Sequence, residues 1–250
     1  MRSFVRLSWV NLKLFLREPL TVVFSFALPL IILFVLGGVF GNEVSQPVDG
    51  TVVFRGQGPM SYYVPAYVAL VIASVCVISI PTHLAGDRER GVLKRLHASS
   101  VTSWTVAGAE MAVAFVVSTV SAAILLTAAW IAYDFEAPRS VPMVLGVVVI
   151  LTVGFALFGI FLGSILPTGR AAQAVGMLVW FVMLFLGGAG PPPEVLTGGM
   201  QTLADFTPLW HAVLMMQDAW LGLDAGLSWG VFIMIGAASA LLGIRFFRWE

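Results

Sequence analysis

The sequence predicts an all-α polytopic membrane protein, with six transmembrane helices, an N-terminal amphipathic interfacial helix and short extracellular helices before the last span. Three observations support this fold class. Of the 250 residues, 59% are hydrophobic and only 10% are charged, whereas soluble proteins contain about 25% charged residues. The mean hydropathy is +0.98. Six apolar runs approach the length of about 20 residues that a helix needs to cross a bilayer.

Helices are the expected spanning elements, because every backbone N–H and C=O group in lipid must be paired within the protein. Residues 1–250 are predicted to form one transmembrane domain. Its predicted spans are residues 20–40, 62–83, 104–132, 141–166, 171–190 and 227–247. Within the fourth span, Gly159 and Gly163 have the spacing that lets two helices approach closely.

Residues 2–18 are predicted to form the interfacial helix. At about 100° per residue, the basic side chains of this segment fall on one stripe, and apolar side chains such as Phe4 and Leu14 lie opposite. The basic residues are Arg2, Arg6, Lys13 and Arg17. The alternative is a cytoplasmic tail helix that packs on the protein.

The distribution of basic residues predicts that both termini are cytoplasmic. With that orientation, eleven of the 13 Lys and Arg residues lie inside, and only Arg55 and Arg139 lie outside. The first span is expected to be retained, because its apolar run is long and no small-residue cleavage site follows it. Arg outnumbers Lys, which fits a bacterial genome, so the predicted location is the bacterial plasma membrane.

The loop at residues 84–103, between the second and third spans, is unusually charged. Six of the 26 charged residues of the chain lie in its DRERGVLKRL segment, residues 87–96. The segment is predicted to be a short cytoplasmic helix that Gly91 interrupts. Charged residues around apolar ones are typical of a surface that docks another protein. The alternative is a topology signal without a partner.

Several kinds of chemistry are missing from the sequence. The Gly-Lys-Ser/Thr of a phosphate-binding loop is absent, because Lys13 precedes Leu and Lys94 precedes Arg. The chain is therefore not expected to be an enzyme, and neither catalytic nor metal-ligating residues are predicted. A formal net charge of zero gives no indication of nucleic-acid binding. His83 and His97 are expected at the interface or in the loop, and Glu110 is expected to pair with the basic residues of that loop.

Residues 191–226 are predicted to form an extracellular re-entrant segment. The GGAGPPPEVL stretch must end the fifth span, because it concentrates helix-breaking Gly and Pro residues. The stretches MQTLADF and PLWHAVLMMQDAWLG then show helical spacing and are too short to span a bilayer. They are expected to dip into the outer leaflet or to cap the helix bundle.

Two motifs resemble those of type-2 ABC exporter permeases, in particular the daunorubicin-resistance type of multidrug permease, which is also used for lipids and glycoconjugates. The charged loop is similar to the family pattern R-E-R-G-T-L-K-R-L, with Val92 in place of Thr; the matching residues are Arg88, Glu89, Arg90, Gly91, Leu93, Lys94, Arg95 and Leu96. The outer segment matches at Pro192, Glu194 and Pro208, and it departs from the common Thr-Tyr pair at Trp210 and His211.

The resemblance implies a subunit of an exporter. Two permeases, either two copies of this chain or one with a sister permease, would pair in the lipid membrane above two ABC ATPase subunits, which would bind ATP and Mg. Loop 87–96 and the N-terminal helix would receive the motion of the ATPases. The contacts expected at the rim are Arg88, Glu89, Lys94 and Arg95, and the expected apolar anchors are Leu93 and Leu96.

The substrate implied by the resemblance is hydrophobic or amphipathic: a drug, a lipid or a glycoconjugate. Aromatic residues of the first and fifth spans could line its path; they are Phe24, Phe34, Trp180, Phe181 and Phe185. Two other functions stay open. One is an autonomous carrier or channel, which would need carboxylates near the middle of the membrane. The other is a membrane scaffold without a transport function.

Overall fold

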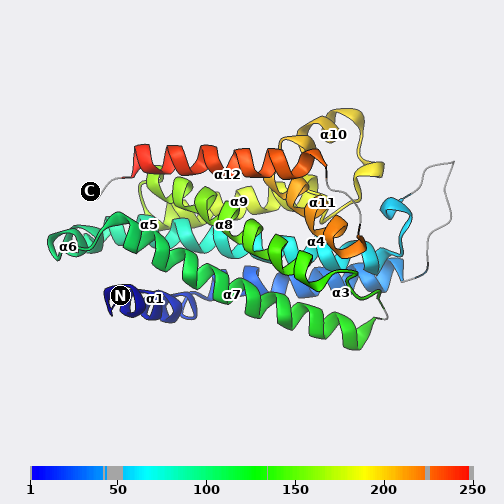
Figure 1. Ribbon diagram of the computed structural model, residues 1–250, viewed down its shortest axis with the longest axis horizontal. Helices are drawn as coiled ribbons and strands as arrows, with labels where there is room; N and C mark the ends of the chain where they lie inside the picture. Colours follow the sequence, from blue (N-terminus) through cyan, green and yellow to red (C-terminus); the bar gives the residue numbers. More distant parts are fainter. Residues whose placement is uncertain (1, 42, 44–52, 134, 223–225, 248–250) are drawn as a thin grey trace.

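The computed structural model describes residues 2–41, 43, 53–133, 135–222 and 226–247, and every regular element in these ranges is helical (Figure 1). Six helices are long and apolar enough to cross a membrane, which confirms the predicted fold class. These helices run along the long axis of the molecule, and the two chain ends lie at the same end of the bundle. We call this the terminal end, and the end that carries α10 and α11 the distal end.

The spanning helices are close to the predicted ones. The first, Pro19–Phe40, joins α2 (Pro19–Val22), the π-helix η1 (Val23–Ala27) and α3 (Leu28–Phe40), and the second, Pro59–Glu89, joins α4 (Pro59–Ser74), the π-helix η3 (Val75–Ser79) and α5 (Ile80–Glu89). The others are α7 (Ser103–Ala132), α8 (Val141–Ile165), α9 (Gly169–Leu186) and α12 (Leu227–Phe246). The shorter helices are α1 (Arg2–Phe15), η2 (Phe54–Gly56), α6 (Val92–Ala98), η4 (Pro193–Val195), α10 (Gly198–Asp205) and α11 (Pro208–Leu221).

Both π-helical segments lie just before a proline. Pro29 follows η1 and Pro81 follows η3. A proline in a helix has no N–H to donate, and its ring clashes with the carbonyl group four residues earlier. In both helices that carbonyl belongs to the π-helical segment, at Ser25 and Val77, where the wider turn accommodates the ring.

The second spanning helix forms the centre of the bundle. Its apolar window is fully buried, whereas in the other five spans 22–50% of the window is buried. Its α4 part packs against α3, α7 and α11, and its η3 and α5 parts pack against α8 and α9. The helix extends beyond the predicted residues 62–83 at both ends, because it remains packed on these neighbours up to Glu89.

Close packing around η3 depends on two glycines. A Cβ atom on Gly159 of α8 would overlap the carbonyl oxygen of Cys76, and one on Gly176 of α9 would lie 2.6 Å from the carbonyl oxygen of Val77. The close approach predicted at Gly159 is therefore confirmed, and its partner is the central helix. The fifth span ends at Leu186 rather than at residue 190, because Gly188 adopts a positive φ of 76°.

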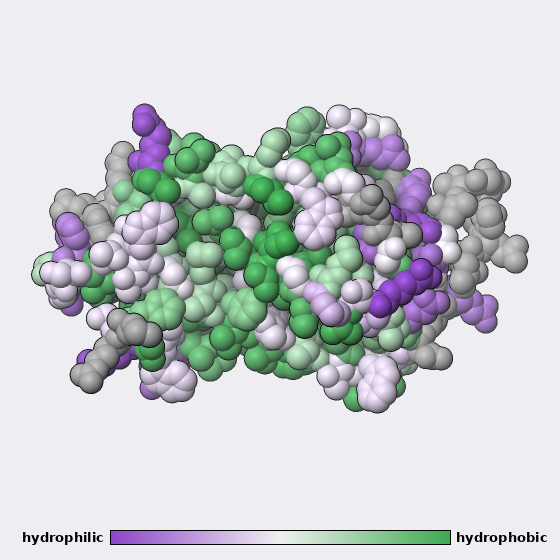
Figure 2. Space-filling view, in the orientation of Figure 1, coloured by the Kyte–Doolittle hydropathy of each residue, from purple (hydrophilic) through white to green (hydrophobic). Residues whose placement is uncertain are grey.

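Helix α1 packs on α7 and also exposes apolar side chains. Asn11 and Phe15 are buried, whereas Val5 and Trp9 are each more than half exposed. The helix thus has both a protein-facing side, as in the alternative interpretation, and a lipid-compatible side, as in the interfacial one. On the face shown in Figure 2, hydrophobic residues cover the middle of the molecule and hydrophilic residues gather toward both ends, as expected for a protein that spans a bilayer.

The predicted short helices before the last span are confirmed, but the two differ in burial. Helix α10 is largely exposed at the distal end. Helix α11 is almost entirely buried and packs against α4, α8 and α12. Such a short helix can lie at depth because the surrounding helices shield its ends.

Replacement of Gly159 by Ala is expected to destabilise the protein, because the added methyl group overlaps a backbone oxygen that cannot rotate away. Overpacking of this kind costs about 1–3 kcal/mol. The matched control is Gly146→Ala, also on α8, where nothing lies within 4 Å of the added atom. Thermal denaturation in detergent should show a lower midpoint for G159A only. Equal midpoints for the two variants would contradict the packing described here.

Candidate functional site

The charged segment forms a sharp helix–turn–helix at the terminal end. Helix α5 continues through Asp87 and Arg88 and ends at Glu89; Gly91 then adopts a left-handed conformation with φ of 68°, and α6 begins at the next residue. Only glycine takes this conformation without steric cost, so Gly91 sets the direction of α6. The predicted short helix and its interruption at Gly91 are thus confirmed.

Two predicted coupling residues bind the ends of neighbouring helices in the same chain. The guanidinium group of Arg88 donates hydrogen bonds to the carbonyl oxygens of Ser164, at 2.9 Å, and of Leu166, at the end of α8. The carboxylate of Glu89 accepts a hydrogen bond of 3.0 Å from the backbone N–H of Gly169, which begins α9. A cation at a helix C-terminus and an anion at an N-terminus are both favourable. The two residues therefore tie α5 to α8 and α9.

The other residues of the segment divide into inward and outward groups. Leu93 was expected to contact a partner, but it is only 1% exposed and its contacts are with its own chain. Leu96 is half-buried, and Arg90 pairs with Asp87 at 3.0 Å. Lys94 and Arg95 are exposed on α6, so they are the basic residues of α6 that this structure presents to a partner.

A buried polar cluster lies beside this turn, centred on His83 of α5. Its Nε2 atom is 3.3 Å from a carboxylate oxygen of Glu18, and its Nδ1 atom is 3.7 Å from one of Glu110. The other oxygen of Glu110 accepts a hydrogen bond of 2.7 Å from the side-chain amide of Asn11. Asn11, His83 and Glu110 are each 3% exposed. The cluster links α1 and the α1–α2 junction to α5 and α7.

The predictions for His83 and Glu110 are wrong. His83 lies buried in α5 rather than in a loop, and the carboxylate of Glu110 faces Asn11 and His83 rather than the basic residues of the charged segment. The physical reason is burial: an unpaired polar side chain inside the bundle is costly, so these groups face each other. An Asn, a His and a Glu, each isolated in a different apolar segment, were the signal in the sequence.

The carboxyl group of Glu18 is stabilised in its charged form. Burial raises its pKa, but the interactions with His83, with the hydroxyl group of Thr21 at 3.0 Å and with Arg90 more than offset this effect, so the pKa lies below its usual range. Glu18 is thus a charged group at the point where α1 joins the first span.

The distal end contains a second polar network. Arg55 and Asp218 form an ion pair of 2.6 Å, and Arg55 also donates to the side-chain oxygen of Gln217 at 3.2 Å. The hydroxyl groups of Tyr62 and Tyr63 donate to the carbonyl oxygens of the glycines that follow α9, Gly188 and Gly190, at 3.0 Å each. The network holds η2, α4, α11 and the end of α9 together, and the sequence did not predict it.

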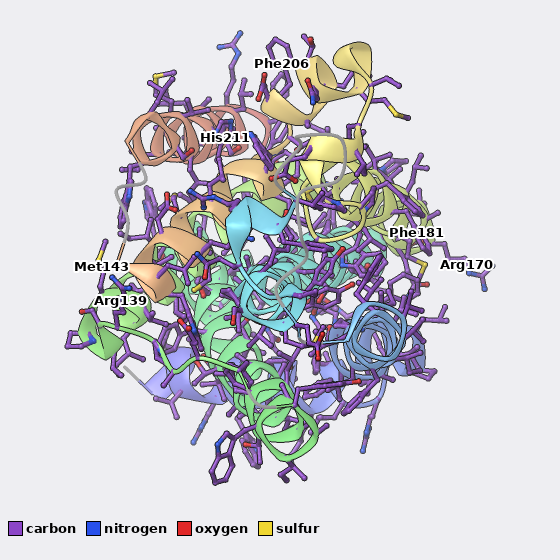
Figure 3. All side chains as sticks on the ribbon, turned by 90° about the vertical axis from the view of Figure 1, so that its right-hand side faces the viewer. Arg139, Met143, Arg170, Phe181, Phe206 and His211 are labelled. Carbon is purple, nitrogen blue, oxygen red and sulfur yellow. The ribbon has the colours of Figure 1, made fainter. Side chains whose placement is uncertain are left out.

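The predicted outer residues line the same region. The ring of Trp210 packs on Gly188, and Pro208 begins α11. His211 lies between α11 and α12 (Figure 3), where its Nε2 is 2.8 Å from the carbonyl oxygen of Asp205. Pro192 is buried, and one carboxylate oxygen of Glu194 is buried without a hydrogen bond within the described structure.

Three of the five aromatic residues predicted for a substrate path form one cluster. The ring centroid of Trp180 is 5.1 Å from those of Phe24 and Phe181, which joins the first and fifth spans. Trp180 is fully buried, whereas Phe181 lies at the periphery of the bundle (Figure 3). Phe34 instead packs on Tyr133 with centroids 5.7 Å apart, and Phe185 is 58% exposed.

These features define a multi-pass helical membrane protein with a charged helix–turn–helix at one end. Among the described residues, His, Cys, Asp and Glu side chains form no group that could hold a metal ion. The sequence profile of the ABC-2 type transporter family matches residues 2–221. The chain therefore belongs to this family, as the resemblance of its two motifs predicted.

Two relatives support the assignment. The chain is 23% identical over 193 residues to the probable multidrug ABC transporter permease YbhR of Escherichia coli K12; this match covers 75% of the chain but only 52% of YbhR. It is 25% identical over 247 residues to the daunorubicin resistance ABC transporter permease protein DrrB1 of Streptomyces coeruleorubidus, covering 94% of the chain and 80% of that protein. The chain thus spans about half the length of YbhR and most of DrrB1.

Replacement of His83 by Ala is expected to destabilise the protein strongly, because it leaves the buried carboxylate of Glu110 without its charge partner. Breaking a buried pair in this way costs about 3–5 kcal/mol. Thermal denaturation in detergent should show a much lower midpoint for H83A than for His97→Ala, since His97 is exposed on α6.

The double variant H83A/E110Q separates charge from packing. Replacement of Glu110 by Gln removes the unpaired charge and keeps an acceptor for Asn11, so the double variant should be more stable than H83A alone. If the loss of stability in the double variant instead equals the sum of the losses in H83A and E110Q, the two side chains do not interact as described.

Proposed function

We propose that this chain is the membrane-spanning permease subunit of an ATP-driven exporter and that a separate ABC ATPase subunit, with its own ATP and Mg, supplies the energy. The observation that carries the proposal is the helix–turn–helix at α5–α6, which exposes Lys94 and Arg95 at the terminal end. The proposal places this end and both termini in the cytoplasm, because the charged segment and α1 concentrate the basic residues of the chain there.

Transmission of motion from α6 follows from the contacts of α5. A displacement of α6 acts on the end of the fully buried second span. Arg88 and Glu89 carry the displacement to the adjoining ends of α8 and α9, and His83 carries it to α1 and α7. Tightly packed helices respond to such a push by moving as rigid bodies, so a small shift at α6 can tilt several spans.

The surface that would contact the ATPase is formed by α6. Lys94 and Arg95 would form charged contacts at the rim of a groove in the partner, and the half-buried Leu96 would provide an apolar contact. Arg88 and Glu89 would act indirectly, since their side chains hold α8 and α9. The N-terminal helix would follow the movement through the Glu18–His83 contact.

The exporter would contain two permease subunits, from two copies of this chain or from this chain and a sister permease, above two ATPase subunits.

The proposed substrate is a hydrophobic or amphipathic compound: a drug, a lipid or a glycoconjugate. The names of YbhR and DrrB1, a multidrug and a daunorubicin resistance permease, favour the first of these. The cluster of Phe24, Trp180 and Phe181 joins the two spans along which we propose that the substrate passes.

Reversal of both charges on α6, by Lys94→Glu and Arg95→Glu, is expected to abolish binding of the ATPase. The tagged chain would be extracted from its host in mild detergent, and copurifying proteins would be quantified by mass spectrometry. The wild-type chain should recover an ABC ATPase, and the variant at least tenfold less. The matched control is Arg170→Glu with Arg245→Glu, which reverses two exposed charges outside α6.

The control variant should retain at least half of the recovered ATPase. Equal recovery with K94E/R95E and the wild type would show that α6 is not the contact. The wild-type chain would be produced in cells that also produce an ABC ATPase. If it is then recovered without that ATPase, the proposed function itself is contradicted.

A further inference from the structure

A cavity of about 660 Å³ lies between α1 and the α5–α6 turn. Apolar side chains from both sides line it, among them Leu7, Leu14 and Leu96, together with Arg6 on α1 and Arg17 in the turn after α1. Its size lies within the range of roughly 300–1,000 Å³ that small-molecule sites occupy. Neither transport nor ATPase binding as proposed above assigns a role to this cavity.

The charges that line the cavity do not cancel. Asp87 pairs with Arg90 at 3.0 Å, and Glu18 lies 3.3 Å from His83. Arg6 and Arg17 have no ion-pair partner among the described residues. Arg6 lies on α1 and Arg17 lies two residues beyond the end of that helix, and both line the cavity. Three arginines and two carboxylates line the cavity, so it carries a net positive charge next to an apolar wall.

A buried polar group also borders the cavity. His83 is 3% exposed and lines it, and neither ring nitrogen makes a hydrogen bond within the described structure. The nearest groups are the carboxylates of Glu18 and Glu110, at charge-pair distances. The inner wall of the cavity is therefore polar, whereas the wall formed by α1 is largely apolar.

The surroundings of the cavity are suited to lipid. Trp9 on α1 is 58% exposed and Leu16, directly after α1, is 63% exposed; the ammonium group of Lys13 lies 5.0 Å from the centre of the Trp9 ring. Exposed Trp and apolar residues beside basic ones are typical of helices at the membrane–water interface. A ligand that reaches the cavity from this side is therefore a membrane component.

We propose that this cavity binds an anionic phospholipid, whose phosphate is attracted by Arg6 and Arg17 and whose glycerol and upper acyl chain contact Leu7, Leu14 and Val92. The lipid would connect α1 to the α5–α6 turn. A wholly apolar ligand would leave the two arginines unpaired, and a free phosphate would gain nothing from the apolar wall. The proposal does not depend on the ATPase, so it can be tested on the purified chain.

The test is binding of short-chain lipids to the full chain in a non-ionic detergent, measured by native mass spectrometry. Dioctanoyl-phosphatidylglycerol should bind at least tenfold more tightly than dioctanoyl-phosphatidylcholine. Arg6→Gln with Arg17→Gln should weaken phosphatidylglycerol binding at least tenfold. The control variant Lys13→Gln with Arg170→Gln removes two exposed basic residues that do not line the cavity, and it should change the affinity less than twofold.

A variant that leaves the charge unchanged tests the apolar part of the site. Val10 lines the cavity and is half exposed, so Val10→Trp should fill the space and weaken binding at least fivefold. Equal losses in the two double variants would show only diffuse attraction of anionic lipid to basic residues and would overturn the proposal. Equal affinity for the two lipids, or displacement of phosphatidylglycerol by an equal concentration of glycerol phosphate, would overturn it as well.

Discussion

A helix that is buried along its whole length must place its polar residues where other segments can pair with them. The second span, Pro59–Glu89, is such a helix. Near its terminal end His83 meets carboxylates from two other segments, and Arg88 and Glu89 bind the ends of α8 and α9. At its distal end Tyr62 holds the turn after α9. These contacts tie the central helix to α7, to α8 and to both ends of α9.

This arrangement explains why charge is concentrated next to the second span. Charged groups are costly within the apolar part of the bundle, so strong contacts between spans occur at its two ends. The terminal end uses Arg88 and Glu89, and the distal end uses the pair of Arg55 and Asp218. Between them, close contacts such as that of Gly159 with the carbonyl group of Cys76 keep the helices in register. A movement at one end therefore has a stiff path to the other.

The sequence predicted the number of spans, their approximate limits, the two short distal helices and the interruption at Gly91. These features depend on local composition, on apolar runs and on glycine conformation, which a single sequence contains. It did not predict the partners of Glu110 and Arg88. The residues of these two contacts are separated by 76 positions and by 99 positions along the chain. The helix packing that brings such distant residues together cannot be deduced from the spacing of residues in the sequence.

We expect α6 and the adjoining ends of α8 and α9 to move as one body, because Arg88 and Glu89 join them. The most direct measurement is a spin-label distance between Ala98→Cys on α6 and Arg170→Cys on α9, with the ATPase subunit bound. The native Cys76 is buried, so a label added to the folded protein reacts at the two introduced sites. If these helices move together, the distance between the two labels should have the same narrow distribution without nucleotide and with trapped ATP. A distance that changes between the two states would contradict this expectation.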